Sequence, residues 1–155
     1  MPNDCENFLY IDGPKSDVLA FIDAVKTDEK EFDFNKLVPM PQSESVSWTV
    51  EHWGTKWGAY EELEWEIEED GDNADANIFY KTAWSPATKF LINVSKLYPT
   101  LTFRHEYGEV GFEFIGTQTI KNGILLKDFN PEWDSKEGIG LRKDIGIYYN
   151  EENEE

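Results

Sequence analysis

Glutamates occupy every second position of one short segment, YEELEWEIEED at residues 60–70. Successive side chains of a β-strand point to opposite faces, so a strand over residues 60–68 would carry these carboxylates in a row about 6.7 Å apart. The row consists of Glu62, Glu64, Glu66 and Glu68. The side chains between them, Leu63, Trp65 and Ile67, would face a core. Such a row suits a basic partner, because arginines grip carboxylates through paired hydrogen bonds.

The acidic segment extends beyond this row, since no Lys or Arg occurs between Lys56 and Lys81. The predicted partner-binding residues are Glu62, Glu64, Glu66, Glu68, Glu69, Asp70 and Asp72. The whole chain carries 32 acidic against 14 basic residues, a net charge of −18. That charge argues against direct binding to nucleic acid or to an anionic membrane. We therefore expect a basic protein as partner, such as a host factor that binds nucleic acid. The alternative is that the row only keeps the protein soluble.

A second candidate site combines two aromatic segments, HWGTKWGAY at residues 52–60 and TAWSP at residues 82–86. A cleft between them would be formed by Trp53, Lys56, Trp57, Trp84 and Ser85. Lys56, the Ser85 hydroxyl and a helix N-terminus could then bind an anionic ligand, with His105 nearby, in a small enzyme or ligand-binding domain. The alternative is two tight turns, with tryptophans in the core and Ser85 as a helix cap.

Other chemistry finds little support in the residue spacing. Cys5, His52 and His105 match no closed zinc pattern, and the acidic loop from Asp70 to Asp75 lacks the spacing of an EF-hand. The sequence contains no P-loop, nucleophile elbow or dinucleotide fingerprint. A solvated row of carboxylates also would not separate two pKa values as acid–base catalysis requires. We predict no catalytic residue, metal or cofactor, and a protein that is not an enzyme.

The hydrophobic pattern predicts the elements that would position these residues. The predicted strands cover residues 5–12, 60–68, 78–83, 101–107 and 111–120. A first helix is predicted over residues 14–27, and a second begins with Ser85 as N-cap and Pro86 in its first turn. Residues 31–41 and 70–77 read as loops because of their prolines and turn residues, respectively.

This order predicts an α+β fold, a ferredoxin-like βαββαβ sandwich with additional C-terminal strand structure. Its helices would cover one face of the sheet, and the glutamate row would line the other, open face. We expect a single domain over residues 1–150, with an irregular extension from about residue 121. The acidic tail, residues 151–155, is predicted to be disordered because it has no apolar side chain to bury.

Several stretches resemble the YubB-like ferredoxin-like domain family, whose members are carried largely by plasmids and phages. The matching stretches, within residues 3–120, are NFLYIDGP, FDFNKLVPMP, HWGTKWGAY, FYKTAWSPA and GFEFIG. The sequence departs from the family pattern with His52-Trp53 before GTKW and with Ala87 in place of a second proline. The resemblance implies a ferredoxin-like fold and a mobile-element origin, and it carries over no catalytic residue. With the acidic row, it leads to the hypothesis of a nucleic-acid mimic that inhibits a host DNA- or RNA-binding protein.

The remaining features concern location and assembly. One cysteine, no signal-like N-terminus and no long apolar segment predict a cytoplasmic protein. An open sheet edge would permit a homodimer, which the sequence leaves open, as it leaves open an accessory structural role.

Overall fold

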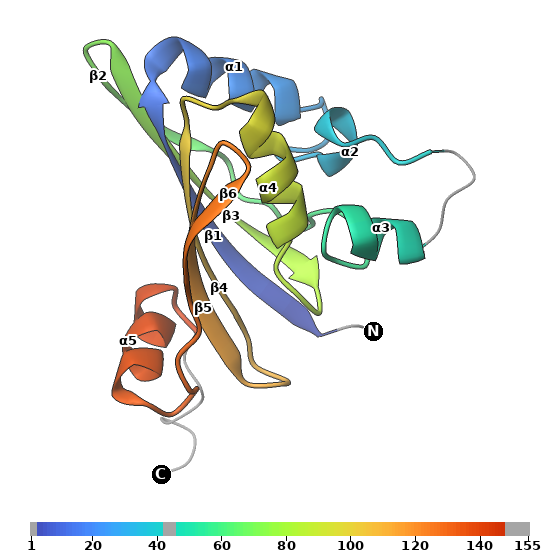
Figure 1. The fold of residues 1–155 in the computed structure, drawn as a ribbon, viewed down its shortest axis with the longest axis vertical. Helices are drawn as coiled ribbons and strands as arrows, with labels where there is room; N and C mark the ends of the chain where they lie inside the picture. The colour runs from blue at the N-terminus through green and yellow to red at the C-terminus, as the bar shows by residue number, and fades with distance from the viewer. Residues whose placement is uncertain (1–2, 42–45, 148–155) are drawn as a thin grey trace.

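The computed structural model describes residues 3–41 and 46–147. Six strands form one antiparallel sheet in the order β2-β3-β1-β4-β5-β6 (Figure 1). They span Asp4–Pro14 (β1), Glu66–Asp70 (β2), Asn73–Ala83 (β3), Thr102–Glu109 (β4), Phe114–Lys121 (β5) and Ile124–Phe129 (β6). The helices span Lys15–Val25 (α1), Phe34–Leu37 (α2), Val46–His52 (α3), Thr88–Leu97 (α4) and Lys136–Asp144 (α5).

The path of the chain through β1, α1, β2, β3, α4 and β4 is the split βαβ arrangement. β1 and β3 lie in the centre of these four strands, flanked by β2 and β4. β5 and β6 then extend the sheet beyond β4. The predicted class, an α+β ferredoxin-like fold with additional C-terminal strand structure, is therefore confirmed.

The main core lies between the sheet and the helices α1 and α4. α1 buries Val18, Phe21, Ile22 and Val25, and α4 buries Phe90, Leu91 and Val94. Many aromatic rings meet there: Phe34 stacks on Phe90 with ring centroids 3.9 Å apart, for example. These contacts explain the high aromatic content, since each large ring contributes much buried apolar area.

The fifth helix, α5, lies on the opposite side of the sheet and covers one end of that face (Figure 1). A small second core forms there from Ile115, Trp133, Ile145 and Ile147, with Phe8 packed against it. Gly108 makes this contact possible, because a Cβ atom at this position would lie 2.5 Å from Ile147 Cδ1. β6 is the additional C-terminal strand that was predicted, whereas the rest of the segment after residue 121 was predicted to be irregular, and that expectation is wrong for α5. The predicted tail, residues 151–155, lies outside the described residues.

The predicted glutamate strand over residues 60–68 is only partly correct. β2 begins at Glu66, and upstream of it a single β-bridge joins Tyr60 to Lys81. Glu61 has a left-handed φ of 50°, which interrupts an extended chain. Trp65 is buried as predicted, whereas Leu63 and Ile67 are exposed. Leu63 lies before β2, where the chain no longer follows the strand alternation, and Ile67 lies on an edge strand whose hairpin projects past the helices (Figure 1).

The predicted loop over residues 70–77 is also wrong. Asp70 pairs with Asn73, so Gly71 and Asp72 alone form the hairpin turn, with Gly71 at φ 60°. Residues 73–77 already belong to β3, where Ala74 and Ala76 are buried. Ala74 and Ala76 face the core, and the polar residues between them face the open side of the sheet. This alternation continues the strand pattern through residues 73–77.

Candidate functional site

Carboxylates from three neighbouring strands meet on the open face of the sheet, near the β2–β3 hairpin. Glu68 of β2 lies opposite Asp75 of β3, and Asp75 lies opposite Asp12 of β1. Neighbouring strands are about 4.8 Å apart, so these three acids form a row across the sheet. Glu66 and Asp70 flank Glu68 on the same face of β2, because alternate residues of a strand share a face.

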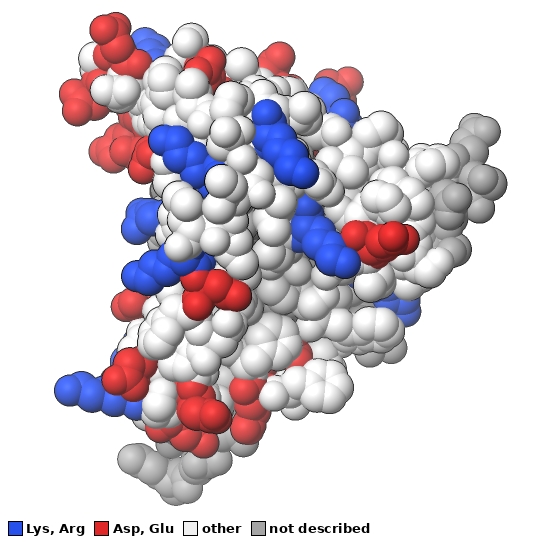
Figure 2. Space-filling model, in the orientation of Figure 1, with Lys and Arg blue, Asp and Glu red and all other residues white. Residues whose placement is uncertain are grey.

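These five acids, which we call the hairpin carboxylates, are Asp12, Glu66, Glu68, Asp70 and Asp75. All five are exposed, and none forms an ion pair with another described residue. Two shallow depressions lie between them, one lined by Glu66, Glu68, Asp75 and Asn77 and one by Asp12, Asp70, Asn73 and Asp75. Figure 2 shows acidic side chains gathered over the hairpin at the upper left of the view. The arrangement presents concentrated, uncompensated negative charge.

The predicted partner-binding residues do not all lie on one face of the sheet. Glu62 has only 11% of its side chain exposed and lies 3.8 Å from Lys30 Nζ. Glu69 points to the helix side of β2, where it pairs with Lys15 at 3.2 Å. Glu64 is exposed but precedes the strand, and Asp72 lies in the turn. Only Glu66, Glu68 and Asp70 therefore lie on the open face.

Sequence reasoning missed Asp12 and Asp75 as members of this surface. Asp12 follows the apolar residues of β1, and Asp75 stood in the segment predicted as a loop. The alternation of Asn73, Asp75 and Asn77 with alanines was the available signal for Asp75. Nothing local indicated that Asp12 would lie beside it, because strand pairing depends on distant parts of the chain.

The two aromatic segments of the second candidate site do come together. Ser85 Oγ donates a hydrogen bond to the Gly54 carbonyl at 2.7 Å, and Thr55 Oγ1 donates one to the Ala83 carbonyl at 2.8 Å. Lys56 Nζ lies 4.8 Å from the centre of the Trp57 ring and 4.4 Å from that of Trp84. The two segments are thus tied by hydrogen bonds and by one ammonium shared between two rings.

The expected helix cap at Ser85 is wrong. α4 begins at Thr88 with Ala87 as its N-cap, and the Ser85 hydroxyl is used on Gly54 instead. The Phe90 amide, in the first turn of α4, donates to the Trp53 carbonyl at 3.1 Å. Trp53 itself is buried, and its indole donates to the Val38 carbonyl. One amide of the α4 N-terminus is therefore already hydrogen-bonded to the Trp53 carbonyl and is not available to an anion.

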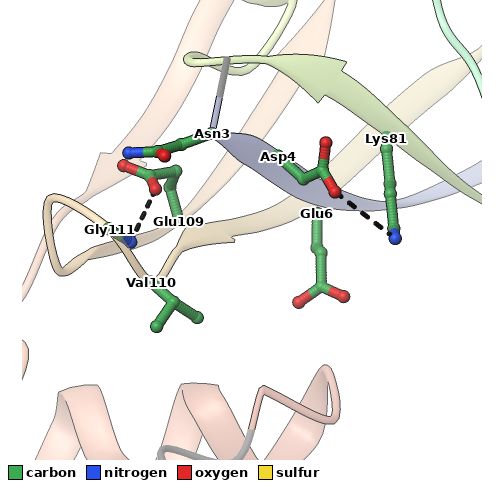
Figure 3. Close-up of a pocket in the computed structure, with 7 residues that line it drawn as sticks. All are labelled: Asn3, Asp4, Glu6, Lys81, Glu109, Val110 and Gly111. Atoms are coloured by element: carbon green, nitrogen blue, oxygen red, sulfur yellow. Dashed lines mark hydrogen bonds and ion pairs between the residues drawn. The ribbon is translucent and has the colours of Figure 1, made fainter. Parts of the chain in front are cut away.

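Near the start of β1, a pocket lies on the open face (Figure 3). Its lining residues are Asn3, Asp4, Glu6, Lys81, Glu109, Val110 and Gly111. Lys81 Nζ lies 2.7 Å from Glu61 and 3.6 Å from Asp4, and the hydrogen bond with Glu61 raises the pKa of Lys81. Burial raises the pKa of Glu6, an effect that Lys81 partly opposes. The buried Glu109 carboxylate is occupied by the amides of Gly111 and Phe112. Among the described residues, Glu6 is thus the carboxylate of this pocket whose side chain forms no ion pair or hydrogen bond.

The three residues weighed as zinc ligands are not assembled into a site. Cys5 and His105 are both buried, whereas His52 lies on α3 with its ring stacked on Trp48. In the described part of the chain, no group of three His, Cys, Asp or Glu side chains could hold a metal ion. The same residues include no helix that is long and apolar enough to cross a membrane.

The sheet order and the helices on one face define a ferredoxin-like domain. The chain belongs to the family described as "Ferredoxin-like domain in Api92-like protein", whose model matches residues 53–154. Among solved structures it is similar to the protein Api92 from Yersinia pseudotuberculosis, with 13% sequence identity and a TM-score of 0.49. That match covers 66% of this chain and 40% of the Api92 chain, so our chain corresponds to less than half of that protein. No curated protein matches the sequence.

The family match begins at Trp53, after β1 and α1. In this fold β1 lies between β3 and β4 and pairs with both. The domain in this chain therefore includes residues that precede the matched region.

Proposed function

We propose that this chain is a non-enzymatic interaction protein of mobile-element origin that binds a basic partner through the hairpin carboxylates. The observation that carries the proposal is the cross-strand row of Glu68, Asp75 and Asp12, exposed and without ion pairs among the described residues. Like charges directly opposite each other destabilise a sheet. A partner's arginines or lysines would relieve that repulsion on binding, so part of the binding free energy comes from the row itself.

The partner class follows from the charge pattern. The positions that carry these carboxylates repeat about every 6.7 Å along β2 and about every 4.8 Å from strand to strand, so they form a dense anionic surface, as a nucleic-acid backbone does. A protein that binds nucleic acid offers the complementary basic groove. We therefore propose a nucleic-acid mimic that occupies such a groove in a host DNA- or RNA-binding protein. Its binding would be fast at low ionic strength and would weaken steeply with added salt.

The test is affinity capture from host lysate at low and high salt with two charge-matched variants. The first variant neutralises the open-face hairpin acids through Glu66→Gln, Glu68→Gln, Asp70→Asn and Asp75→Asn. The control removes the same number of charges on the helix side through Asp23→Asn, Asp28→Asn, Glu29→Gln and Glu51→Gln, all of them exposed. Glu62 stays unchanged, because its ion pair with Lys30 helps to hold the segment before β2.

We expect a nucleic-acid-binding protein to be retained by the wild type and by the control, and to be lost from the hairpin variant. Salt and competing DNA or RNA should both release it. Equal capture by the control and the hairpin variant would contradict the proposal, because the effect would then follow total charge and the hairpin would serve solubility.

A second candidate function is ligand binding at the two aromatic turns, and one observation favours it. Trp84 has a left-handed φ of 70°, a costly conformation for a bulky residue, and its ring is exposed. Strain of this kind gathers at binding sites. A thermal-shift screen against nucleotides and other small anions tests this candidate. A shift that disappears in Lys56→Met would support it, and no shift with any compound would count against it.

A further inference from the structure

Three aromatic rings lie together on the open face of the two central strands. Phe8 and Tyr10 of β1 are stacked, with ring centroids 5.5 Å apart and planes 14° apart. Phe79 of β3 lies directly opposite Phe8, and the two rings meet edge to face at 5.6 Å. All three side chains are partly exposed. Helices α1 to α4 pack on the other face, so their core does not account for Tyr10 and Phe79. Phe8 also packs against the small core beneath α5, which covers part of its ring.

These rings lie between two groups of acids along β1. Asp12 and Asp75 stand opposite each other beyond Tyr10, and Glu6 stands beyond Phe8, beside the pocket shown in Figure 3. From Asp12 to Glu6 the strand runs six residues, which is about 20 Å. We call this surface the aromatic track; it consists of Asp12, Asp75, Tyr10, Phe8, Phe79 and Glu6. A track of this length matches about six residues of an extended peptide.

The protein already places one guanidinium on the track. The Arg104 guanidinium carbon, from the neighbouring strand β4, lies 4.9 Å from the centre of the Tyr10 ring. Glu106 lies two residues further along β4, opposite Phe8. An arginine stacked on an aromatic face with a carboxylate near its edge uses both the planarity and the charge of the guanidinium. The exposed ring surface of Phe79, together with the part of Phe8 that the second core leaves uncovered, offers the same kind of contact to a second arginine.

We propose that the aromatic track binds an extended, arginine-bearing segment of the basic partner. Arginine side chains stack on Phe79 and Phe8, and basic residues at either end pair with Asp12 and Asp75 or with Glu6. This inference rests on the proposed function and specifies the partner segment further, as an extended chain that carries arginines. Single-stranded nucleic acid could also stack on such rings. The carboxylates at both ends of the track repel phosphates and so favour the peptide.

Two fluorescent peptides of equal charge, deca-arginine and deca-lysine, test the track by fluorescence anisotropy at low salt. The wild type should bind deca-arginine about tenfold more tightly than deca-lysine, because only arginine gains both stacking and paired hydrogen bonds. Phe79→Leu keeps an apolar side chain but removes the ring, and it should bring the two affinities close to each other. Phe112→Leu is the matched control, since Phe112 is exposed on the β4–β5 turn outside the track. Tyr10→Leu repeats the test if Phe79→Leu fails to fold.

The possible outcomes separate the two proposals. If both peptides bind and the ratio of their affinities is the same in the wild type, Phe79→Leu and Tyr10→Leu, the proposed aromatic track is overturned. The hairpin proposal would then remain intact. No binding of either peptide would overturn both. Tight binding of a labelled ten-nucleotide single-stranded RNA that Phe79→Leu abolishes would replace the peptide by nucleic acid as the ligand.

Discussion

His105 Nε2 lies 2.8 Å from Asn7 Oδ1, and both side chains are buried beneath the helices. Asn7 Nδ2 donates to the Cys5 carbonyl and to Thr82 Oγ1, each at 3.0 Å, which fixes Asn7 Oδ1 as an acceptor. His105 Nε2 must therefore carry a proton. Burial lowers the pKa of His105 to about 4, although the contact with Gln118 acts in the opposite direction. The ring is thus neutral at physiological pH, with a defined tautomer.

This neutral histidine predicts a stability change with pH. The pKa of His105 is about 4 in the folded protein against 6.5 in an unfolded chain, so the unfolded state binds more protons between these values. The contribution of neutral His105 to the free energy of unfolding is fully present above pH 6.5. It is lost as the pH falls to 4, which lowers the free energy of unfolding by about 3 kcal/mol. Urea unfolding across this range should show the loss in the wild type and in His52→Gln. His105→Gln should lack it, and an unchanged pH profile in His105→Gln would contradict the assignment.

Gly108, on β4 beneath the small second core, and Gly140, on α5, should respond in opposite directions to alanine. At Gly108 a Cβ atom would lie 2.5 Å from Ile147 Cδ1 and 2.7 Å from Ile115 Cδ1, so Gly108→Ala should lower the free energy of unfolding by about 1–3 kcal/mol. At Gly140, on α5, a Cβ atom meets nothing within 4 Å. Gly140→Ala should raise stability by about 0.5–1 kcal/mol through helix propensity. Chemical denaturation measures both, and a neutral Gly108→Ala would mean that α5 packs less closely on the sheet.

The ammonium of Lys56 should be energetically coupled to the Trp84 ring. A double-mutant cycle with Lys56→Met and Trp84→Asn isolates their interaction, and asparagine tolerates the left-handed backbone at this position. We expect a coupling of about 0.5–1 kcal/mol in the free energy of unfolding. The same cycle with Lys89→Met, at an exposed position on α4, should give no coupling. Additive effects in the Lys56 cycle would show that the contact contributes nothing to stability.

Cys5 should be inert in the folded protein. It is fully buried, and burial raises the pKa of its thiol, so the reactive thiolate is scarce. We expect an aromatic disulfide reagent to label Cys5 no faster than the protein unfolds, with full labelling in denaturant. A Cys5→Ala/Ser16→Cys variant, with its thiol on the exposed side of α1, should react at once. Rapid labelling of the wild type would reveal local opening of the β1 end.

Much of the fold could be predicted because the apolar residues of the strands and helices recur with clear periods. β1, α1, β4 and β5 follow these patterns closely. α5 was missed because Gly138 and Gly140 lower its helix propensity and because it has little apolar surface. Its local signal was Ser135, whose side chain accepts a hydrogen bond from the Gly138 amide as a helix N-cap.

The candidate site was less predictable than the fold. Alternation indicated the common face of Glu66 and Glu68, but it could not show where the strand begins. Glu62 therefore lies beside Lys30 instead of in the row. Asp12 joins the row through pairing between residues 63 positions apart, a register that local sequence does not encode.

The position of β1 has a consequence for how the protein must be made. β1 is synthesised before the other strands of this sheet, yet both of its neighbours, β3 and β4, follow more than fifty residues later. Until they are synthesised, the apolar inner face of β1 lacks the two strands that it pairs with in this sheet. The sheet cannot form strand by strand in sequence order, so we expect slow folding dominated by non-local contacts and a need for protection of β1 during synthesis.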